Sequence, residues 1–291
     1  MTEVLAADRG VPPVPPSVKG ATWRRIGRYA LLCLAAFIVL FPIYSAIVVA
    51  IQPAAALTRG LSVLFPSEVT FSVFGDAFDQ GNLGRYLRNS LVQASLTTIG
   101  QVVTSVLAAY AFAFLRFPGK RIVFFAFLAT LMVPTEVIIV GQYRIASDLG
   151  WLNTYQGLVV PFLAWTFGTF MIRQAFMNTP PDLRDATALD GYGHFGFLWH
   201  VAIPLARPAI AGLAVFAFLN AWNEYLWPLL VTDKPDVRTI QVGLKSLSSA
   251  NVDELNLVMA GTLIAALPIA LVLIVFQRHL VRGLTAGAVK G

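Results

Sequence analysis

The stretch LVMAGTLIAALPIALVLIVF, residues 257–276, runs for twenty residues without a charged side chain. About 20 helical residues cross the roughly 30 Å hydrocarbon core of a bilayer. Lipid offers no water to backbone N–H and C=O groups, so a spanning segment must pair these groups internally, which a helix does and a single strand does not. Residues 257–276 therefore predict a transmembrane helix.

The composition of the whole chain also indicates a membrane protein. Of its 291 residues, 57% are hydrophobic and 12% are charged, whereas about a quarter of the residues in soluble domains are charged. We predict an all-α membrane protein with six transmembrane helices, at residues 29–51, 90–115, 122–146, 157–176, 210–230 and 257–276. The prolines inside these ranges are expected to kink the helices without ending them, namely Pro42, Pro134, Pro161 and Pro268.

The distribution of Lys and Arg predicts the orientation. With a cytoplasmic N-terminus, 14 of the 21 basic residues fall on the cytoplasmic side, which satisfies the positive-inside rule and places both termini in the cytoplasm. These residues are Arg9, Lys19, Arg24, Arg25, Arg28, Arg116, Lys120, Arg121, Arg173, Arg184, Arg207, Arg278, Arg282 and Lys290. Their scatter over short loops explains the pI of about 9.7 without a stripe that binds nucleic acid.

The N-terminal region has two parts. Residues 1–20 carry four prolines and few apolar side chains, so we expect a disordered cytoplasmic tail before a single membrane domain, 21–291. The first span could also be a signal peptide, because Ala54-Ala55-Ala56 resembles a cleavage site. Its apolar core is longer than the roughly 7–15 residues of such peptides, which favours a transmembrane helix.

The longest internal connection, residues 178–208, interleaves charged and apolar side chains. Thr179-Pro180-Pro181-Asp182 is typical of a helix start, with proline at an early position and an acid in the first turn. A short amphipathic helix is expected to run to about Leu189, followed by a turn at Asp190-Gly191 and a second helical stretch up to Ile203-Pro204. This connection predicts a folded element on the cytoplasmic face.

Gly191, Gly193 and Gly196 form a G-x-G-x-x-G pattern, but its context excludes a dinucleotide site. Such a site needs a preceding strand, a following helix and an acid about 20 residues later. Here a helix precedes the first glycine, and the next acid, Glu224, lies in a predicted span. We expect the glycines to loosen the junction between two short helices.

Other chemistry-bearing patterns are weak. The histidines, His194, His200 and His279, lack ligand spacing, and Cys33 is the single cysteine, so no metal site is expected. Gly119-Lys120 lacks the glycine and the Ser or Thr that a Walker A loop needs around it. We therefore expect no catalytic residues, no cofactor and no nucleotide site in this chain.

Ionisable residues in the spans are the candidates for a solute pathway, because such groups are costly in lipid. Glu136 and Glu224 are the carboxylates, and the second is surrounded by Trp222, Asn223 and Tyr225. Gln142 and Arg144 lie near the outer end of the third span. The alternatives are pairing with a neighbouring helix for the carboxylates, snorkelling for Arg144, and interface anchoring for the aromatic residues.

Residues 185–191, DATALDG, followed by Ile203-Pro204-Leu205 and Pro208, resemble the EAA loop of ABC importer permeases, E-A-A-x-x-D-G followed by I-x-L-P. Asp185 replaces the usual Glu, and Thr187 the second Ala. In that family the loop forms a coupling helix, between the fourth and fifth spans, that docks on a cytoplasmic ATPase. The resemblance implies this role for Asp185, Ala186, Thr187, Asp190, Gly191 and Pro204.

The resemblance extends over nearly the whole chain. Residues 221–229, AWNEYLWPL, are similar to the W-N-x-[FY]-L-W-P run of carbohydrate-type permeases, and 283–291, GLTAGAVKG, to the end of the smaller maltose-type subunit. The C-terminal tail, 277–291, would then reach the ATPase through Gly287, Ala288 and Lys290. Residues 132–136, MVPTE, together with 222–229, most resemble glycerol-3-phosphate and glycerophosphodiester permeases.

The resemblance implies a multi-pass permease subunit of an ATP-driven importer in the bacterial cytoplasmic membrane. Its partners would be a second permease subunit in a heterodimer, two ATPase subunits that hold ATP and Mg²⁺, an external solute-binding protein and membrane lipid, with no nucleic acid. The alternative is a stand-alone secondary carrier, which would need coupling-ion residues at the midplane and often has an internal repeat.

Overall fold

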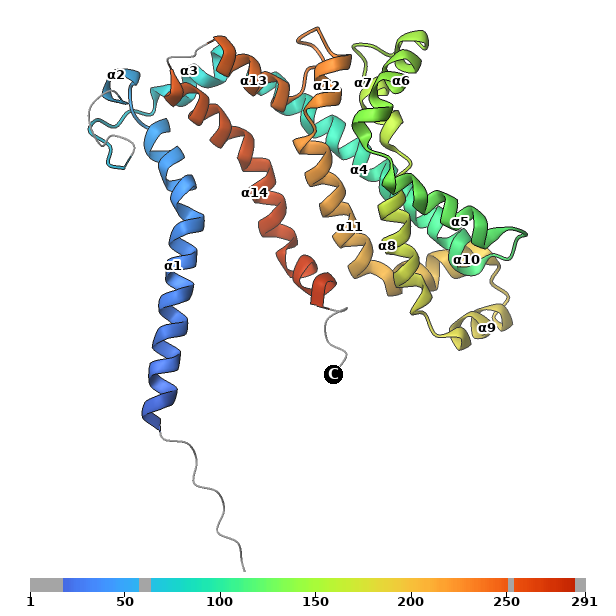
Figure 1. The fold of residues 1–291 in the computed structure, drawn as a ribbon. Coiled ribbons are helices and arrows are strands. Elements are labelled where there is room, and N and C mark those ends of the chain that lie inside the picture. Colours follow the sequence, from blue (N-terminus) through green and yellow to red (C-terminus); the bar gives the residue numbers. More distant parts are fainter. Residues whose placement is uncertain (1–17, 58–63, 251–253, 286–291) are drawn as a thin grey trace, which may run out of the picture.

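The computed structural model describes residues 18–57, 64–250 and 254–285, and all regular structure in these ranges is helical. The elements, in chain order, are α1 (Val18–Ala50), α2 (Ala54–Leu57), α3 (Ser72–Gln80), α4 (Leu83–Phe114), α5 (Lys120–Ala129), η1 (Thr130–Met132), α6 (Thr135–Asp148), α7 (Tyr155–Val159), η2 (Val160–Phe162), α8 (Thr166–Met177), α9 (Pro181–Leu189), α10 (His194–Phe197), η3 (Leu198–Ala202), α11 (Ile203–Asn223), α12 (Leu226–Val231), α13 (Ile240–Ala250) and α14 (Leu255–Thr285) (Figure 1).

Several of these helices can cross a membrane. Over the described ranges, four are long and apolar enough, at residues 24–50, 83–114, 194–223 and 255–277. Two bent pairs, 120–132 with 135–148 and 155–162 with 166–177, raise the number to six if each pair is one span. The prediction of an all-helical chain with several apolar spans is therefore confirmed.

The third predicted span, 122–146, is not one kinked helix. η1 ends at Met132, α6 begins at Thr135, and the two parts meet at 99°. Val133 (φ −85°, ψ 117°) and Pro134 (φ −60°, ψ 135°) are both extended. The proline ring disfavours the helical region for the residue before it, so Pro134 breaks the helix where the sequence predicts a kink.

The fourth and fifth predicted spans are also interrupted. α7 and η2 meet α8 at 46°, with Trp165 extended (φ −121°, ψ 109°). In the fifth span, predicted as 210–230, α11 ends at Asn223, Glu224 is extended (φ −64°, ψ 124°), and α12 follows. These breaks free backbone groups beside a polar cavity, which is where membranes tolerate irregular backbone.

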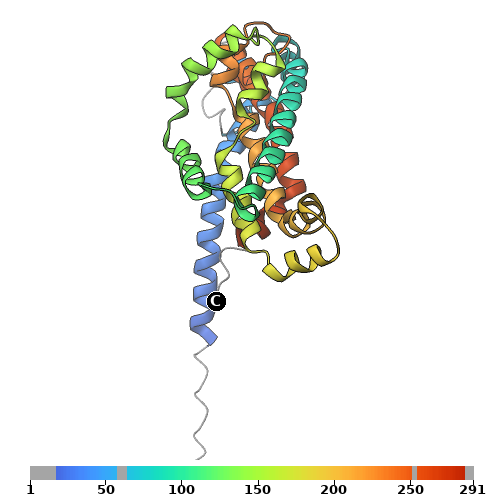
Figure 2. The same ribbon diagram turned by 90° about the vertical axis from the view of Figure 1, so that its right-hand side faces the viewer.

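The N-terminal helix begins earlier than predicted. α1 starts at Val18, so residues 18–20 of the expected tail are helical, and residues 1–17 lie outside the described residues. Figures 1 and 2 show α1 projecting beyond the rest of the bundle at its N-terminal end, with α9 and the C-terminal end of α14 at that same end of the molecule. The apolar side chains of its middle, Leu31 to Leu40, are exposed in the isolated chain.

Three clusters of buried side chains hold the bundle together. One joins α3, α4, α11, α13 and α14 around Trp222 and Ile240, and a second joins α4, α8, α10 and α11 around Phe176 and Leu213. The third joins α6, α7 and α12 around Trp227. Because α4 contributes to two clusters and contacts α8 and α11 extensively, it is the central helix of the bundle.

The connection 178–208 folds largely as the sequence predicts. α9 covers Pro181–Leu189, and Gly191 adopts a left-handed turn (φ 82°) that favours glycine. One detail differs, because the second helical stretch does not stop at Ile203-Pro204. α10 passes through a π-helical turn, η3, directly into α11, with Pro204 in the first turn, where a missing N–H is tolerated.

Candidate functional site

A cavity of about 420 Å³ lies where the interrupted spans meet. α4 forms one wall, and the breaks between η1 and α6, η2 and α8, and α11 and α12 form the others. Its polar lining residues are Gln93, Thr97, Gln101, Thr130, Thr135, Gln142, Thr166, Asn220 and Glu224. The broken helices therefore bring hydroxyl, amide and carboxylate groups to one partly open space.

Three buried atoms in this lining have no hydrogen-bond partner in the protein: Thr97 Oγ1, Gln101 Oε1 and Gln142 Oε1. A buried polar group without a partner costs about 1–3 kcal/mol, so such groups are normally met by water or a bound molecule. Gln101 Nε2 donates to the Phe162 carbonyl at 2.9 Å, which fixes the amide with its oxygen unpaired. These atoms lie beneath the wall, so the polar character of the accessible surface comes from the other hydroxyl, amide and carboxylate groups of the lining.

Glu224 occupies the junction of the cavity with two smaller spaces, of about 370 and 190 Å³. It lies in the break after α11, and its Oε1 accepts a hydrogen bond from the Trp227 N–H at 3.3 Å. The side chain therefore caps the first turn of α12 while its carboxylate stays on the cavity wall.

The other predicted pathway residues divide into two groups. Glu136 lines the 190 Å³ space, Gln142 lines that space and the main cavity, and Asn223 lines the 370 Å³ space. Arg144 and Tyr225 are not among the lining residues of these three spaces.

Trp222, which was also predicted to line the pathway, lies in the core. It is 1% exposed and stacks on Phe218 in the core, with the ring centroids 5.7 Å apart. The helical twist of α11 points this side chain toward α4 and α14, away from the wall that carries Glu224.

Sequence reasoning missed the wall that α4 contributes. Asn89, Gln93, Thr97, Gln101 and Ser105 are all buried and recur at every fourth position. Residues four apart lie on neighbouring positions of one helix face, so this spacing makes a continuous buried polar stripe along α4. The stripe is visible in the sequence and could have identified the cavity-lining face.

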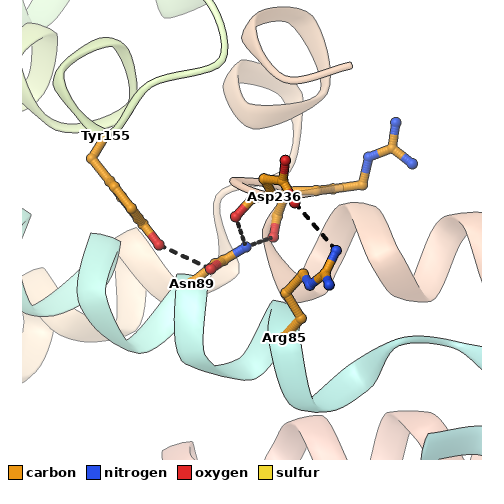
Figure 3. Close-up of polar contacts among 5 residues, drawn as sticks. Arg85, Asn89, Tyr155 and Asp236 are labelled. Atoms are coloured by element: carbon orange, nitrogen blue, oxygen red, sulfur yellow. Dashed lines mark hydrogen bonds and ion pairs between the residues drawn. The ribbon is translucent and has the colours of Figure 1, made fainter. Parts of the chain in front are cut away.

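At the end of the molecule opposite α9, the same stripe begins with a buried polar network (Figure 3). Asn89 Nδ2 donates to the carbonyls of Asp236 (2.9 Å) and Arg238 (3.0 Å), and Asn89 Oδ1 accepts from the Tyr155 hydroxyl (2.9 Å). An exposed ion pair, Arg85–Asp236 at 3.2 Å, lies beside it. Asn89 thereby ties α4 to α7 and to the loop between α12 and α13.

We expect Asn89→Ala to lower the free energy of unfolding by about 2 kcal/mol, because it leaves two carbonyls and a partly buried hydroxyl unpaired. Asp236→Ala, which removes only the exposed ion pair and keeps the carbonyl, should cost less than about 1 kcal/mol. Thermal unfolding of the purified protein measures both variants. Equal melting temperatures for the two variants would contradict this role of Asn89.

A second surface lies on α9 and the elements that follow it. Asp185 and Ala186 are exposed, whereas Thr187 is buried and its hydroxyl donates to the Leu183 carbonyl. Asp190 ends the helix, with its N–H bonded to the Ala186 carbonyl at 3.0 Å. Pro204 is half-buried, and the predicted tail residues Gly287, Ala288 and Lys290 lie outside the described residues.

Large apolar side chains project around this surface: Leu189 is 88% exposed, Phe195 81% and Trp199 70%. Apolar side chains gathered beside exposed acids are typical of a protein interaction site. Within the described residues no cluster of potential metal ligands occurs. His194 instead contacts the Tyr110 hydroxyl, which bonds both its ring Nδ1 (3.1 Å) and its carbonyl (3.0 Å), and thereby holds α10 against α4.

A bundle of apolar helices with a polar cavity at broken spans, and a helix with exposed apolar neighbours at one end, defines a membrane transport protein. Residues 101–286 match the family described as the inner membrane component of binding-protein-dependent transport systems. The chain belongs to this family.

The curated relatives are similar over most of their length. Proteins named "sn-glycerol-3-phosphate transport system permease protein UgpE" are 36% identical in Agrobacterium fabrum (89% of this chain, 95% of the relative), 35% in Brucella abortus and 33% in Yersinia pestis (each 88% and 94%). The chain is accordingly the permease subunit of an ABC importer, an integral membrane protein and not itself an enzyme.

Solved structures share the fold. A chain of a bacterial ABC transporter involved in the import of the acidic polysaccharide alginate superimposes with a TM-score of 0.79 at 24% identity, over 91% of this chain and 99% of that chain. A chain of the alginate transporter in complex with an alginate pentasaccharide-bound periplasmic protein gives a TM-score of 0.62 at 17% identity, over 87% and 94%.

Proposed function

We propose that the chain crosses the bacterial cytoplasmic membrane six times, with each bent pair forming one span and both termini in the cytoplasm. The gathering of α9 and the two termini-bearing helix ends at one end of the molecule supports this topology. So does the excess of Lys and Arg that the positive-inside rule assigns to this side. The domain then comprises residues 21–291, with the coupling loop at 178–208 and the tail at 277–291.

In the same proposal the chain pairs with a second permease subunit, two ATPase subunits and an extracytoplasmic solute-binding protein. ATP and Mg²⁺ belong to the ATPase subunits. The exposed apolar face of α1 suits lipid or the second permease. The solved alginate transporter carries a periplasmic protein in its complex, which supports a binding-protein partner by analogy.

α9 acts as the coupling helix in this arrangement. Asp185 would offer its carboxylate to a basic group of the ATPase, and the exposed Leu189, Phe195 and Trp199 would supply apolar contact. Small Ala186 and buried Thr187 allow close approach, while the turn at Asp190-Gly191 sets the angle toward α11. Gly287, Ala288 and Lys290 would form a second contact with the ATPase.

The proposed cargo is a hydroxyl-bearing solute of the sugar or glycerol-phosphate type, and the relatives' name supports sn-glycerol-3-phosphate or a glycerophosphodiester. The pathway would pass the cavity lined by Gln142 and Glu224, with Glu136 and Asn223 at its edges. Closure of the ATPase pair on ATP would pull α9 and open the cavity outward, and hydrolysis would reset it. ATP and the loaded binding protein would each bind the outward-facing state and the inward-facing state with different affinity. This difference would shift the equilibrium between the two states.

The observation that carries this proposal is the identity of 33–36% to named permeases over about nine-tenths of the chain. We expect ATP hydrolysis to co-purify with the chain when it is tagged at its N-terminus, because the sequence itself carries no Walker A pattern. The measurement is phosphate release from the detergent-purified sample, with and without ATP-site inhibition. A chain that purifies alone and inert from gentle detergent would favour a secondary carrier.

A further inference from the structure

The charged side chains of the cavity wall are all negative. None of the described residues that line the main cavity or its two neighbouring spaces is Lys, Arg or His, whereas Glu224 lines all three and Glu136 lines one. Glu224 has no cationic partner in the part of the chain that the structure describes. The field in this space is therefore negative, and low-dielectric walls strengthen it relative to open solvent.

The atoms of this wall that have no hydrogen-bond partner, Thr97 Oγ1, Gln101 Oε1 and Gln142 Oε1, are buried beneath its surface. The preference of the wall therefore rests on its charge.

An uncharged hydroxyl group is compatible with this field. A phosphate or carboxylate is not, because its charge is repelled by Glu224. An anion facing this wall would place like charges together.

We propose that this chain's wall of the cavity binds the uncharged, hydroxyl-bearing part of the solute and selects against anionic groups, with Glu224 as the discriminating residue. The proposal rests on the proposed function in taking this cavity as part of the solute pathway. Any charged group of the solute faces the opposite side of the pathway, away from this chain.

The test measures the local field with charged thiol reagents. Asn220 lines the cavity, is exposed and lies one helical turn before Glu224. Asn220→Cys is placed in a Cys33→Ser background of the assembled importer, so that a single thiol of this chain reacts. Rates are measured with an anionic sulfonate-bearing methanethiosulfonate and with its neutral methyl counterpart, and the ratio of the two rates reports the field.

We expect Glu224→Gln to raise the anionic-to-neutral ratio on the order of three- to tenfold, since it removes a full charge one turn away. Glutamine keeps the oxygen that accepts from the Trp227 N–H, so the fold of the break is preserved. Asp148→Asn, at the far end of α6, removes an equal charge outside the lining and should leave the ratio unchanged.

A second measurement varies the ionic strength. Raising the ionic strength screens the carboxylate, so the same ratio should rise with salt when Glu224 is present and rise less when it is glutamine. An unchanged or lower ratio in Glu224→Gln, or a native ratio that falls with salt, would overturn the proposal. If the rate ratios contradict the proposal but the importer still hydrolyses ATP, the proposed function stands and only the selectivity of the wall is wrong. If the rate ratios are as expected but no ATPase activity co-purifies, the proposed function is wrong instead.

Discussion

Asp185→Lys is expected to abolish ATP-driven uptake while the chain still reaches the membrane. Asp185 is exposed on α9, within the segment that resembles the coupling motif. In the proposed complex, reversal of its charge replaces an attractive contact to a basic group of the ATPase with a repulsive one, which costs several kcal/mol at an interface. Since about 1.4 kcal/mol is a factor of ten, docking should weaken by about a hundredfold or more.

Two matched variants separate this effect from damage to the helix. Asp185→Glu keeps the charge and restores the residue usual in the family pattern, so it should retain native coupling. Asp182→Lys makes the same charge reversal in the first turn of the same helix and should retain most of the native coupling. The measurements are the rate of ATP-driven uptake, the ATPase activity retained on the tagged chain and the amount of the chain in the membrane fraction. If Asp185→Lys retained as much ATPase activity as the native chain, α9 would not be the coupling helix.

The parts of the fold that sequence predicts well depend on local signals. Apolar runs of about 20 residues locate the spans because the bilayer thickness fixes their length. α9 is found because Pro181 and Asp182 mark its start and Asp190-Gly191 its end, and the structure has these bounds. These signals lie within a few residues of the feature that they predict.

The breaks in the spans are harder to predict, because a membrane proline is compatible with a kink or with a break. Pro42 and Pro268 lie inside continuous helices, whereas Pro134 accompanies a 99° turn. Both kinds of segment are apolar enough to be predicted as membrane spans. The difference lies in the tertiary surroundings, since the extended backbone near Pro134 faces a polar cavity that no local pattern describes.

The candidate site is predictable only in part for the same reason. Glu224 is conspicuous because a carboxylate in an apolar run is costly, and it lines the cavity. Trp222, only two residues earlier, points into the core, because adjacent helical residues face different directions. The stripe on α4 consists of uncharged polar residues, which are common in transmembrane helices, so only their fourfold spacing distinguishes them.

Gly157→Ala is expected to lower the free energy of unfolding by about 3 kcal/mol. A Cβ atom at Gly157 would lie 2.2 Å from the carbonyl oxygen of Trp151, a backbone atom that cannot rotate away. That oxygen also accepts from the Thr154 hydroxyl at 2.7 Å, and Thr154 caps α7 by accepting from the Gly157 N–H at 3.2 Å. The methyl group would therefore push apart the whole turn that starts α7.

The displacement should also reach the cavity. The carbonyl of Gly157 accepts from Trp227 Nε1 at 2.8 Å, and Trp227, which is 1% exposed, carries the N–H that holds the Glu224 carboxylate. Movement of Gly157 thus loosens α12 and the wall residue that precedes it. In the thiol assay at Asn220→Cys, Gly157→Ala should shift the rates of the anionic and the neutral reagent even though no charge changes.

Gly141→Ala provides the matched control, because the added Cβ meets nothing within 4 Å and alanine favours a helix over glycine by up to about 1 kcal/mol. Thermal unfolding followed by tryptophan fluorescence should show a fall of roughly 6–12 °C for Gly157→Ala and no fall for Gly141→Ala. Equal melting temperatures for both variants would mean that the 151–157 turn adjusts without strain. The close approach of Trp151 to Gly157 would then not be what anchors α12, and the support of the Glu224 wall would have to come from the contacts of Trp227 with α6 and α7 alone.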